Sequence, residues 1–174
     1  MAKYAVTPTG VESLFGEEEI IVSKTDPKGR LTYVNDVFLR VSHYRLEDLL
    51  GQPHSVIRHP QMPRVVFKLL WDTIQAKKEI FAYVLNMASN GDHYWVFAHV
   101  TPSFDAAGNV IGFHSNRRKP DAAQIGAIKP LYDDLLAIEN KTEDRKIGME
   151  KASETLFGLL KQKGKNYDEF VFSI

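Results

Sequence analysis

The chain has 174 residues, of which 44% are hydrophobic and 25% charged, and these fractions are ordinary for a globular protein. Lysine plus arginine and aspartate plus glutamate both number 22, so the net charge is zero, which argues against nucleic-acid binding by counterion release and against polybasic membrane binding. The chain has no cysteine, which excludes disulfides, thiolate metal sites, cysteine nucleophiles and iron–sulfur clusters.

The length suits one compact domain with an appendage. No apolar run approaches about 18 residues, so we expect no helix that spans a membrane. The first residues, Met1 to Pro8, lack the apolar centre of a signal peptide. We therefore expect a cytoplasmic protein.

The first part of the chain predicts a cap followed by a β-hairpin. Residues 1–19 are mixed in character and end in an acidic run, so we expect a loosely ordered N-terminal cap, with a helical turn at most. Residues 20–25 are rich in β-branched side chains and predict a strand. Residues 26–29, Asp-Pro-Lys-Gly, form a turn motif, and residues 31–35 predict the partner strand.

A helical excursion is predicted next. Residues 36–41 and 44–50 have the pattern of short helical turns, the second of which stops at Gly51. Residues 51–63 combine three prolines with two histidines and an arginine, so they form neither a regular helix nor a central strand. Residues 63–78 predict the main helix, with its N-terminal end buried.

Three further strands complete the predicted sheet. Residues 80–87 and 93–104 flank an Asn-Gly turn, which is the strongest short hairpin signal, and residues 110–116 form the last strand. The order of two strands, helices and three strands indicates an α+β fold: a five-stranded antiparallel sheet with a helical excursion between strands two and three.

The composition changes after Pro120. Apolar residues recur every three or four positions in two segments, which predicts two C-terminal amphipathic helices, the first interrupted by Pro130. Their apolar stripes must bury against the sheet, against each other or against another subunit. We therefore divide the chain into an N-terminal cap (1–19), a central domain that contains the sheet (20–119) and a C-terminal helical extension (120–174) that serves dimerisation or signal output.

Two residues of the proline-rich segment are candidate ligand contacts. Arg58 can clamp a pyrophosphate group bidentately, or it can brace its own loop. His59 can hydrogen-bond a cofactor or ligate haem iron, or it can be satisfied by the backbone of the loop. The sequence leaves both pairs of alternatives open.

Four further side chains are candidates for contact with a ring-shaped cofactor. Trp71 on the main helix can stack on an aromatic ring or belong to the core. Asn35 can bind the polar edge of a cofactor or cap a helix, and Asn86 interrupts an apolar strand, where an unpaired amide is costly. Trp95 shares one strand face with Phe97, and the sequence does not decide whether that face meets the cofactor or the C-terminal helices.

Motifs for catalysis and metal binding do not occur in the sequence. The six histidines show neither HxxxH nor HExxH spacing, which makes a zinc site improbable. GxSxG, the P-loop and a helix-preceding GxGxxG are also missing, so we do not expect an enzyme.

Several of these segments together resemble a PAS sensor domain, and more narrowly the sensory domain of the bacterial aerotaxis (redox and energy taxis) receptors. The resemblance extends over roughly residues 18–138. Its general PAS part is the Asn-Asp and Asn-Gly-Asp pieces, and its aerotaxis-type part is an Arg-His-Pro-x-Met-Pro element with a downstream tryptophan. The matching residues are Asn35-Asp36-Val37-Phe38, Val41-Ser42-His43-Tyr44, Leu49 to His54, Arg58-His59-Pro60-Gln61-Met62-Pro63, Phe67, Trp71, Asn90 to Val96 and Ile128 to Tyr132.

The resemblance implies an FAD cofactor whose redox state is the signal, and it strengthens the case for Arg58 and Trp71 as contacts. The full set of candidate cofactor contacts is Asn35, Arg58, His59, Trp71, Asn86 and Trp95. The family element usually has an acid where this chain has Gln61, which keeps an acceptor and loses the charge. The family also continues into membrane and signalling segments, so for this chain we expect a homodimer that reports redox state or oxygen in trans to a chemoreceptor or a histidine kinase. Two alternatives keep the fold: a gas sensor that binds haem b with His54, His59 or a sheet histidine as the axial ligand, and a cofactor-free module for dimerisation or docking.

Overall fold

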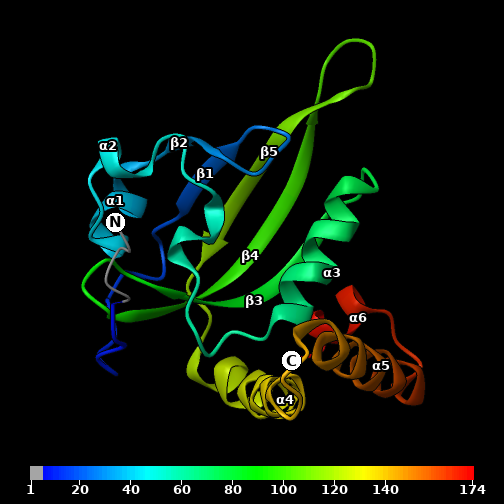
Figure 1. Ribbon diagram of the computed structural model, residues 1–174. Coiled ribbons are helices and arrows are strands. Elements are labelled where there is room, and N and C mark those ends of the chain that lie inside the picture. Colours follow the sequence, from blue (N-terminus) through cyan, green and yellow to red (C-terminus); the bar gives the residue numbers. More distant parts are fainter. Residues whose placement is uncertain (1–5) are drawn as a thin grey trace.

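The computed structural model describes residues 6–174, so the first five residues of the predicted cap lie outside it. The sheet contains β1 (Ile21–Thr25), β2 (Leu31–Val34), β3 (Ile80–Met87), β4 (His93–Phe104) and β5 (Val110–Arg118), in the spatial order β2-β1-β5-β4-β3. Every neighbouring pair is antiparallel. The α+β prediction of a five-stranded antiparallel sheet is therefore confirmed (Figure 1).

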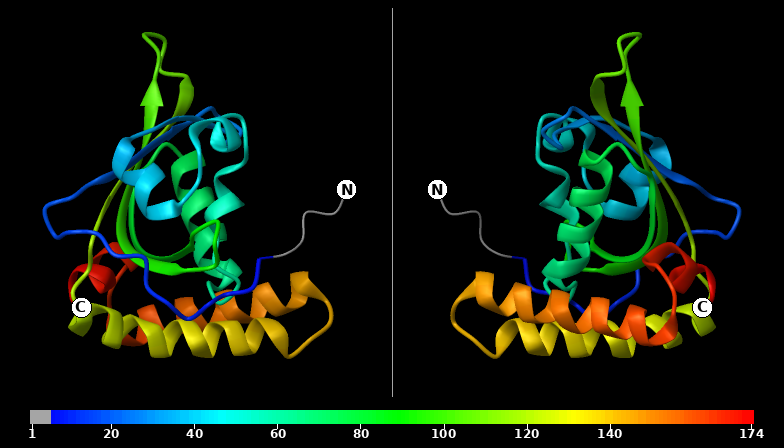
Figure 2. Two further views of the ribbon diagram at one scale, coloured as in Figure 1. Left: turned by 90° about the vertical axis from the view of Figure 1, so that its left-hand side faces the viewer. Right: turned by 90° about the vertical axis from the view of Figure 1, so that its right-hand side faces the viewer.

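The helical excursion lies between β2 and β3, as predicted. It consists of α1 (Asp36–Ser42), α2 (Leu46–Leu49), the 3₁₀ turn η1 (His54–Ile57) and α3 (Arg64–Gln75). Pro63 is the N-cap residue of α3 and offers no side-chain hydrogen bond to the first amides of the helix. The excursion covers one face of the curved sheet (Figures 1 and 2).

The cap residues that the structure describes are extended rather than helical. Backbone hydrogen bonds attach them to the β3–β4 turn: Thr9 N donates to the Gly91 oxygen at 3.0 Å, and Ser13 N donates to the His93 oxygen at 2.8 Å. The expectation of a loosely ordered segment is therefore wrong for residues 9–13, whereas a turn does form at residues 16–19, where Glu19 N donates to the Gly16 oxygen at 3.2 Å. Hydrogen bonds to the β3–β4 turn and the start of β4 hold this segment in place. The local sequence gives no sign of these long-range bonds.

Three helices follow the sheet, one more than predicted: α4 (Ala122–Asn140), α5 (Arg145–Lys163) and α6 (Tyr167–Phe172). α4 continues through Pro130, so the predicted interruption is wrong. The proline removes the bond to the oxygen of Gly126, whose surroundings are open, and burial of Ile128 and Leu135 holds the helix across that gap. No helix among residues 6–174 is long and apolar enough to cross a membrane.

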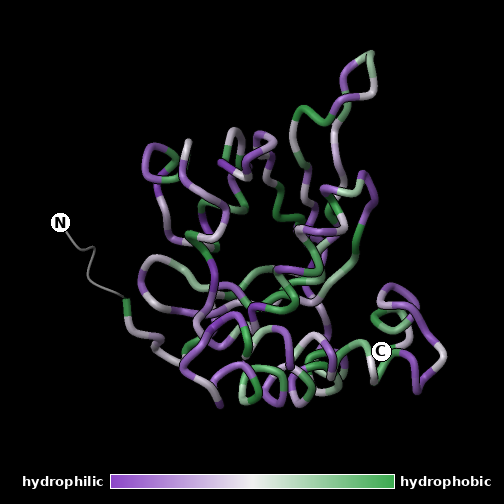
Figure 3. The backbone as a smooth tube through the Cα atoms, turned by 45° about the vertical axis from the view of Figure 1, so that its right-hand side comes forward, coloured by the Kyte–Doolittle hydropathy of each residue, from purple (hydrophilic) through white to green (hydrophobic). Residues whose placement is uncertain are grey.

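The two faces of β4 meet different partners. Ala98 and Val100 face the helical excursion, whereas Trp95 stacks on Tyr132 of α4 with ring centroids 6.0 Å apart. Phe97 meets Phe172 at the end of α6. Apolar residues accordingly gather along the strands and on one side of α4 and α5 (Figure 3). Because side chains alternate along a strand, one face of the sheet packs on the helical excursion and the other on the C-terminal helices.

α4 and α5 form an antiparallel pair that runs across one end of the sheet and reaches the N-terminal end of α3 (Figure 2). Gly148 of α5 permits this close packing, since a Cβ atom there would lie 2.3 Å from the backbone oxygen of Glu139 on α4. Gly158 on the same helix has open space around its Cα atom. The two glycines therefore have opposite structural roles in one helix.

The first prediction compares these glycines. Gly148→Ala forces α4 and α5 apart and lowers the free energy of unfolding by about 1–3 kcal/mol, as overpacking does elsewhere. Gly158→Ala improves helix propensity and raises stability by up to about 1 kcal/mol. Urea unfolding followed by circular dichroism measures both variants, and equal effects of the two substitutions would contradict the packing described here.

Candidate functional site

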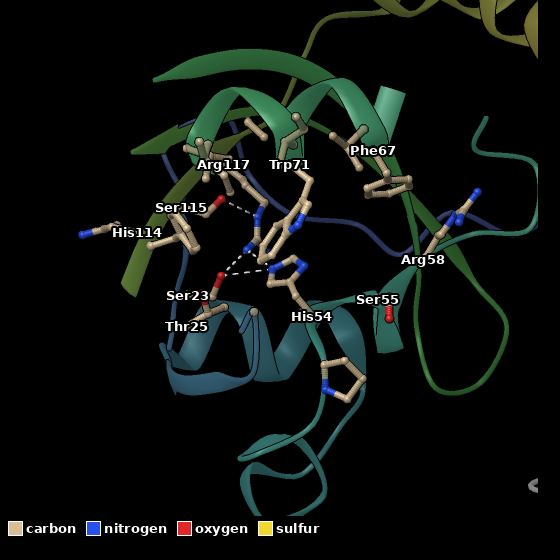
Figure 4. A pocket seen from close by; sticks show the side chains of 18 of the residues that line it. Ser23, Thr25, His54, Ser55, Arg58, Phe67, Trp71, His114, Ser115 and Arg117 are labelled. Carbon is tan, nitrogen blue, oxygen red and sulfur yellow. Dashed lines mark hydrogen bonds between the residues drawn. The ribbon is translucent and has the colours of Figure 1, made fainter. Parts of the chain in front are cut away.

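A cavity of about 330 Å³ lies between the sheet and the helical excursion. The α3 residues Phe67, Leu70, Trp71 and Ile74 form one wall. Residues of β1, β3, β4 and β5 form the opposite wall, and residues 28–29, residues 53–55 and Arg58 complete the lining (Figure 4). The walls are mostly apolar, with a few polar groups, as in small-molecule binding sites generally.

Arg117 of β5 is the main charged group of this cavity. Its side chain is only 2% exposed. Its guanidinium donates to Ser115 Oγ at 3.0 Å, to His54 Nε2 at 2.7 Å and to Ser23 Oγ, and it stands 5.3 Å from the ring centre of Phe38. Burial lowers the pKa of Arg117 to about 10, so the group is still a cation at neutral pH.

His54 is held neutral beside this cation. Because a guanidinium has no acceptor, Nε2 of His54 must accept the bond from Arg117, and the ring carries its proton on Nδ1. Burial, and secondly the charge of Arg117, lower the pKa of His54 to about 3. The pair is therefore one fixed cation with a neutral acceptor beside it.

Three polar atoms of the lining are buried without a hydrogen-bond partner in the structure described: Arg117 Nη1, Asn86 Nδ2 and Thr25 Oγ1. Leaving such a group unpaired costs about 1–3 kcal/mol, and more when it is charged. The lining of the cavity also contains Lys28, Arg58 and Arg117 and no carboxylate. A ligand with acceptor atoms and negative charge would satisfy both features.

Trp71 and Arg58 stand at different depths. The Trp71 ring packs edge-on against Phe113, with centroids 5.5 Å apart, and it lies next to Gly29, where a Cβ atom would come within 3.3 Å of the indole. Arg58 lies beyond Phe67, toward the rim (Figure 4), with its guanidinium 4.8 Å from the ring centre of Phe67. Its Nη2 donates to the Met62 oxygen at 3.0 Å. Arg58 thus braces its loop and also lines the cavity.

Of the six side chains predicted from sequence, Arg58, Trp71 and Asn86 line this cavity. Asn35 does not, because its amide is used in the backbone: Oδ1 accepts from Val22 N at 3.0 Å and from Phe38 N at 3.1 Å, and Nδ2 donates to the Ile20 oxygen at 2.8 Å. The structure therefore gives Asn35 the capping role.

His59 and Trp95 also lie outside the cavity. His59 is buried, its Nδ1 accepts from Gln61 N at 3.1 Å, and its ring meets His93 edge-on. Burial lowers the pKa of His59. Trp95 lies on the opposite face of the sheet, against α4. The structure thus favours satisfaction by the loop backbone for His59, and it turns the Trp95 face toward the C-terminal helices.

The sequence interpretation did not identify Arg117 and Thr25 as site residues, and it considered His54 only as an axial ligand in the haem alternative. A signal for Arg117 does exist: it alternates with Phe113 and Ser115, so these three residues share one face of β5. An arginine on the same strand face as a phenylalanine indicates a buried cation once that face is assigned to the core.

A second cavity of about 430 Å³ lies where the proline-rich segment meets α4 and α5. Arg58 lines both cavities. His59, Arg64, Glu139 and Arg145 are among the other lining residues of the second one. The Glu139 side chain is fully buried there and bonded to Arg64. Neither cavity holds a cluster of three metal-ligating side chains among the residues described.

The second prediction follows from the depressed pKa of His54. The unfolded chain takes up a proton near pH 6.5, whereas folded His54 does not until about pH 3, so stability falls as the pH drops through this window. Relative to His54→Gln, whose amide oxygen can still accept from Arg117, the wild type should lose about 2 kcal/mol between pH 7 and pH 5.

Urea unfolding across that pH range measures the difference. His114→Gln is the control, because His114 is half-buried and its ring is bonded to Asn116 rather than to Arg117. It should follow the wild-type curve. Parallel curves for the wild type and His54→Gln would show that His54 is not held neutral.

Comparison with known proteins identifies relatives of this chain. The family model described as PAS fold matches residues 31–117. The aerotaxis receptor of Escherichia coli (strain K12) is 38% identical over 121 residues, which are 70% of this chain and 24% of the receptor. The nitrogen fixation regulatory protein of Klebsiella pneumoniae is 28% identical over 94 residues, 54% of this chain and 19% of that protein. The chain thus spans a quarter or less of the length of these relatives.

Among solved structures, the dark structure of the blue-light photoreceptor Aureochrome1 LOV superposes with a TM-score of 0.57. It is 22% identical, and the match covers 63% of this chain and 82% of that one, so it shows a shared fold. The sheet order, the helical excursion above the cavity and the family match agree: the chain belongs to the PAS family.

Proposed function

We propose that this chain is a redox or oxygen sensor that binds FAD in the cavity between α3 and the sheet. One observation carries the proposal: the buried Arg117 cation and the unpaired atoms of Asn86 and Thr25 line the same cavity, which contains no carboxylate. The similarity to the aerotaxis receptor supports the choice of a flavin, since the resemblance of the Arg-His-Pro-x-Met-Pro element implies FAD.

The lining residues suit a flavin in three respects. A flavin ring offers carbonyl oxygens and ring nitrogens along one edge, and the lining offers donors on Arg117 and Asn86. Trp71, Phe67 and Phe113 supply apolar and aromatic surface for the ring. A volume of about 330 Å³ suits the ring system, and the phosphates would lie toward the rim, where Arg58 and Lys28 are cations.

Asn86 is the residue proposed to respond to the redox state. A bound flavin supplies an acceptor nitrogen that becomes a donor when the ring is reduced. The Asn86 amide can present either its NH₂ group or its oxygen, and retaining the wrong one costs about 1–3 kcal/mol. Asn86 pairs with Tyr94 across β3 and β4, and its backbone bridges to Arg58. Its rotation would therefore perturb both the sheet and the rim.

The remaining parts of the proposal concern the cellular context. We assign the output to a signalling partner, a chemoreceptor or a histidine kinase, and the site of action to the cytoplasm. A homodimer formed through the C-terminal helices and the absence of turnover complete the proposal. The catalytic motifs sought in the sequence do not occur in it.

The haem alternative has weaker support. Nε2 of His54 accepts from Arg117, His59 lies outside the cavity, and His114 points away from it (Figure 4). A cofactor-free module would leave the unpaired donors of Arg117 and Asn86 uncompensated. Both alternatives therefore rank below the flavin.

The third prediction tests the cofactor directly. The full chain, refolded with excess FAD and desalted, should show flavin absorbance that dithionite bleaches, and its heat-denatured supernatant should contain FAD. A Soret band in protein supplied with haem would instead favour the haem alternative. Colourless protein under both conditions would contradict the proposal.

The fourth prediction tests the phosphate role of the rim. Arg58→Ala removes a charge-assisted contact and should weaken FAD binding by about 10- to 100-fold, as expected for about 1.5–3 kcal/mol. Riboflavin lacks phosphate, so its affinity should change by less than about twofold. Flavin fluorescence titrations measure both ligands.

The matched control is Arg45→Ala, whose side chain is exposed and paired with Glu47 and Asp48. It should alter neither affinity. An equal loss of FAD and riboflavin binding in Arg58→Ala would mean that Arg58 acts only by bracing its loop.

A further inference from the structure

Glu139 of α4 makes an interaction that the proposed function does not use. Its side chain is fully buried. Oε1 accepts from Val65 N at 2.7 Å, and Oε2 accepts from Arg64 N at 3.0 Å and from Arg64 Nε at 3.1 Å. Arg64 and Val65 are the first two residues of α3. The carboxylate therefore caps α3 from a residue more than 70 positions away in sequence.

This cap replaces a missing local one. Pro63 cannot accept a hydrogen bond with its side chain, so the first amides of α3 depend on a distant acceptor. A carboxylate at a helix N-terminus also interacts favourably with the helix dipole. The N-terminal end of α3 is consequently fixed to α4 rather than to its own loop.

α3 connects this cap to the wall of the proposed ligand site. Phe67 lies one turn beyond the cap and Trp71 two turns beyond it, and both line the cavity. A helix of 12 residues transmits displacement along its axis as a nearly rigid body. A shift of the Trp71 wall on ligand binding would therefore act on the bonds to Glu139.

α5 meets the same carboxylate-bearing residue. Gly148 packs so closely on Glu139 that a Cβ atom would lie 2.3 Å from the Glu139 oxygen. Arg64 Nη2 also approaches that oxygen, at 3.5 Å. Glu139 of α4 thus contacts α3 through its side chain and α5 through its backbone.

A buried carboxylate cannot follow α3 gradually. If the donors of α3 move away, Glu139 retains a desolvated charge, which is strongly unfavourable. The second cavity beside it is lined by Arg58 and Arg145, which offer an alternative polar environment. Release from α3 would therefore turn Glu139 toward this cavity rather than leave its charge without donors.

We propose that Glu139 is the positioning residue through which the state of the ligand cavity controls the α4–α5 pair. The inference rests on the proposed function, because it takes FAD as the ligand that displaces α3. It assigns α4 and α5 as the output element of the chain.

Hydrogen exchange of the full chain, followed by mass spectrometry, tests the inference with and without FAD. In the wild type, FAD should change the exchange rates of α5 amides by about fivefold or more, the lower end of ordinary allosteric coupling. In Glu139→Gln, which keeps size and one acceptor oxygen, the change should fall below about twofold while FAD is still bound.

Asp134→Asn is the matched control, since Asp134 is exposed on the same helix. It should respond as the wild type does. Arg64→Met removes the ion pair and keeps both backbone amides, so it should give an intermediate response, and it replaces Glu139→Gln if that variant does not fold. The inference is overturned if FAD binds the wild type without changing α5, or if removing the Glu139 contact leaves the full change.

A wild type that binds no FAD contradicts the proposed function instead, and a ligand-free measurement then decides the inference. Trp71→Ala should alter α5 exchange in the wild-type background and not in the Glu139→Gln background. Additive effects of the two substitutions would overturn the coupling.

Discussion

The rest of this molecule depends on one buried cation, Arg117, that has no carboxylate among its hydrogen-bond partners. Arg117 is supported by two serine hydroxyls, a histidine nitrogen and an aromatic face, all of them neutral. Such support orients a guanidinium but does not neutralise it. β1 supplies Ser23, and η1 supplies His54, so the packing of the helical excursion onto the sheet is also the packing that positions the cation. A substitution that loosens this packing would therefore also displace the cation.

The chain treats its other deeply buried charge in the opposite way. Glu139 has two backbone amides and a guanidinium as donors, so its carboxylate is fully bonded and joins two parts of the fold. The donor Nη1 of Arg117 has no partner in the structure described. A satisfied buried charge indicates a structural joint, whereas an unsatisfied one that lines a cavity indicates a ligand. This difference in bonding separates the two sites more clearly than residue type or burial does.

The sheet could be predicted from the sequence because its signals are local: the β-branched run before Asp26-Pro27-Lys28-Gly29 and the Asn-Gly turn fix two hairpins within a few residues. The site was predictable only in part. Asn86 was found because its amide interrupts an apolar strand, and Arg58 and Trp71 were favoured by the family resemblance. Arg117 was missed because the predicted last strand stopped at residue 116, whereas β5 runs to Arg118, and because a strand pattern does not say which face is buried. α6 had a readable signal, the Asn166–Glu169 capping box, whereas the cap on α3 comes from Glu139 and has no local trace.

The proline-rich segment shows why the local sequence pattern does not predict the contacts on which function depends. Pro53 and Pro63 frame a stretch that forms no α-helix and no regular strand, only the 3₁₀ turn η1, so it joins α2 to α3 with few alternative conformations. Its first histidine, His54, reaches the ligand cavity, and its arginine lines both cavities. Its last residue leaves α3 without a local cap, and that vacancy makes the helix depend on Glu139. The stiffness that places the site residues at one end of the segment therefore creates the link to the C-terminal helices at the other.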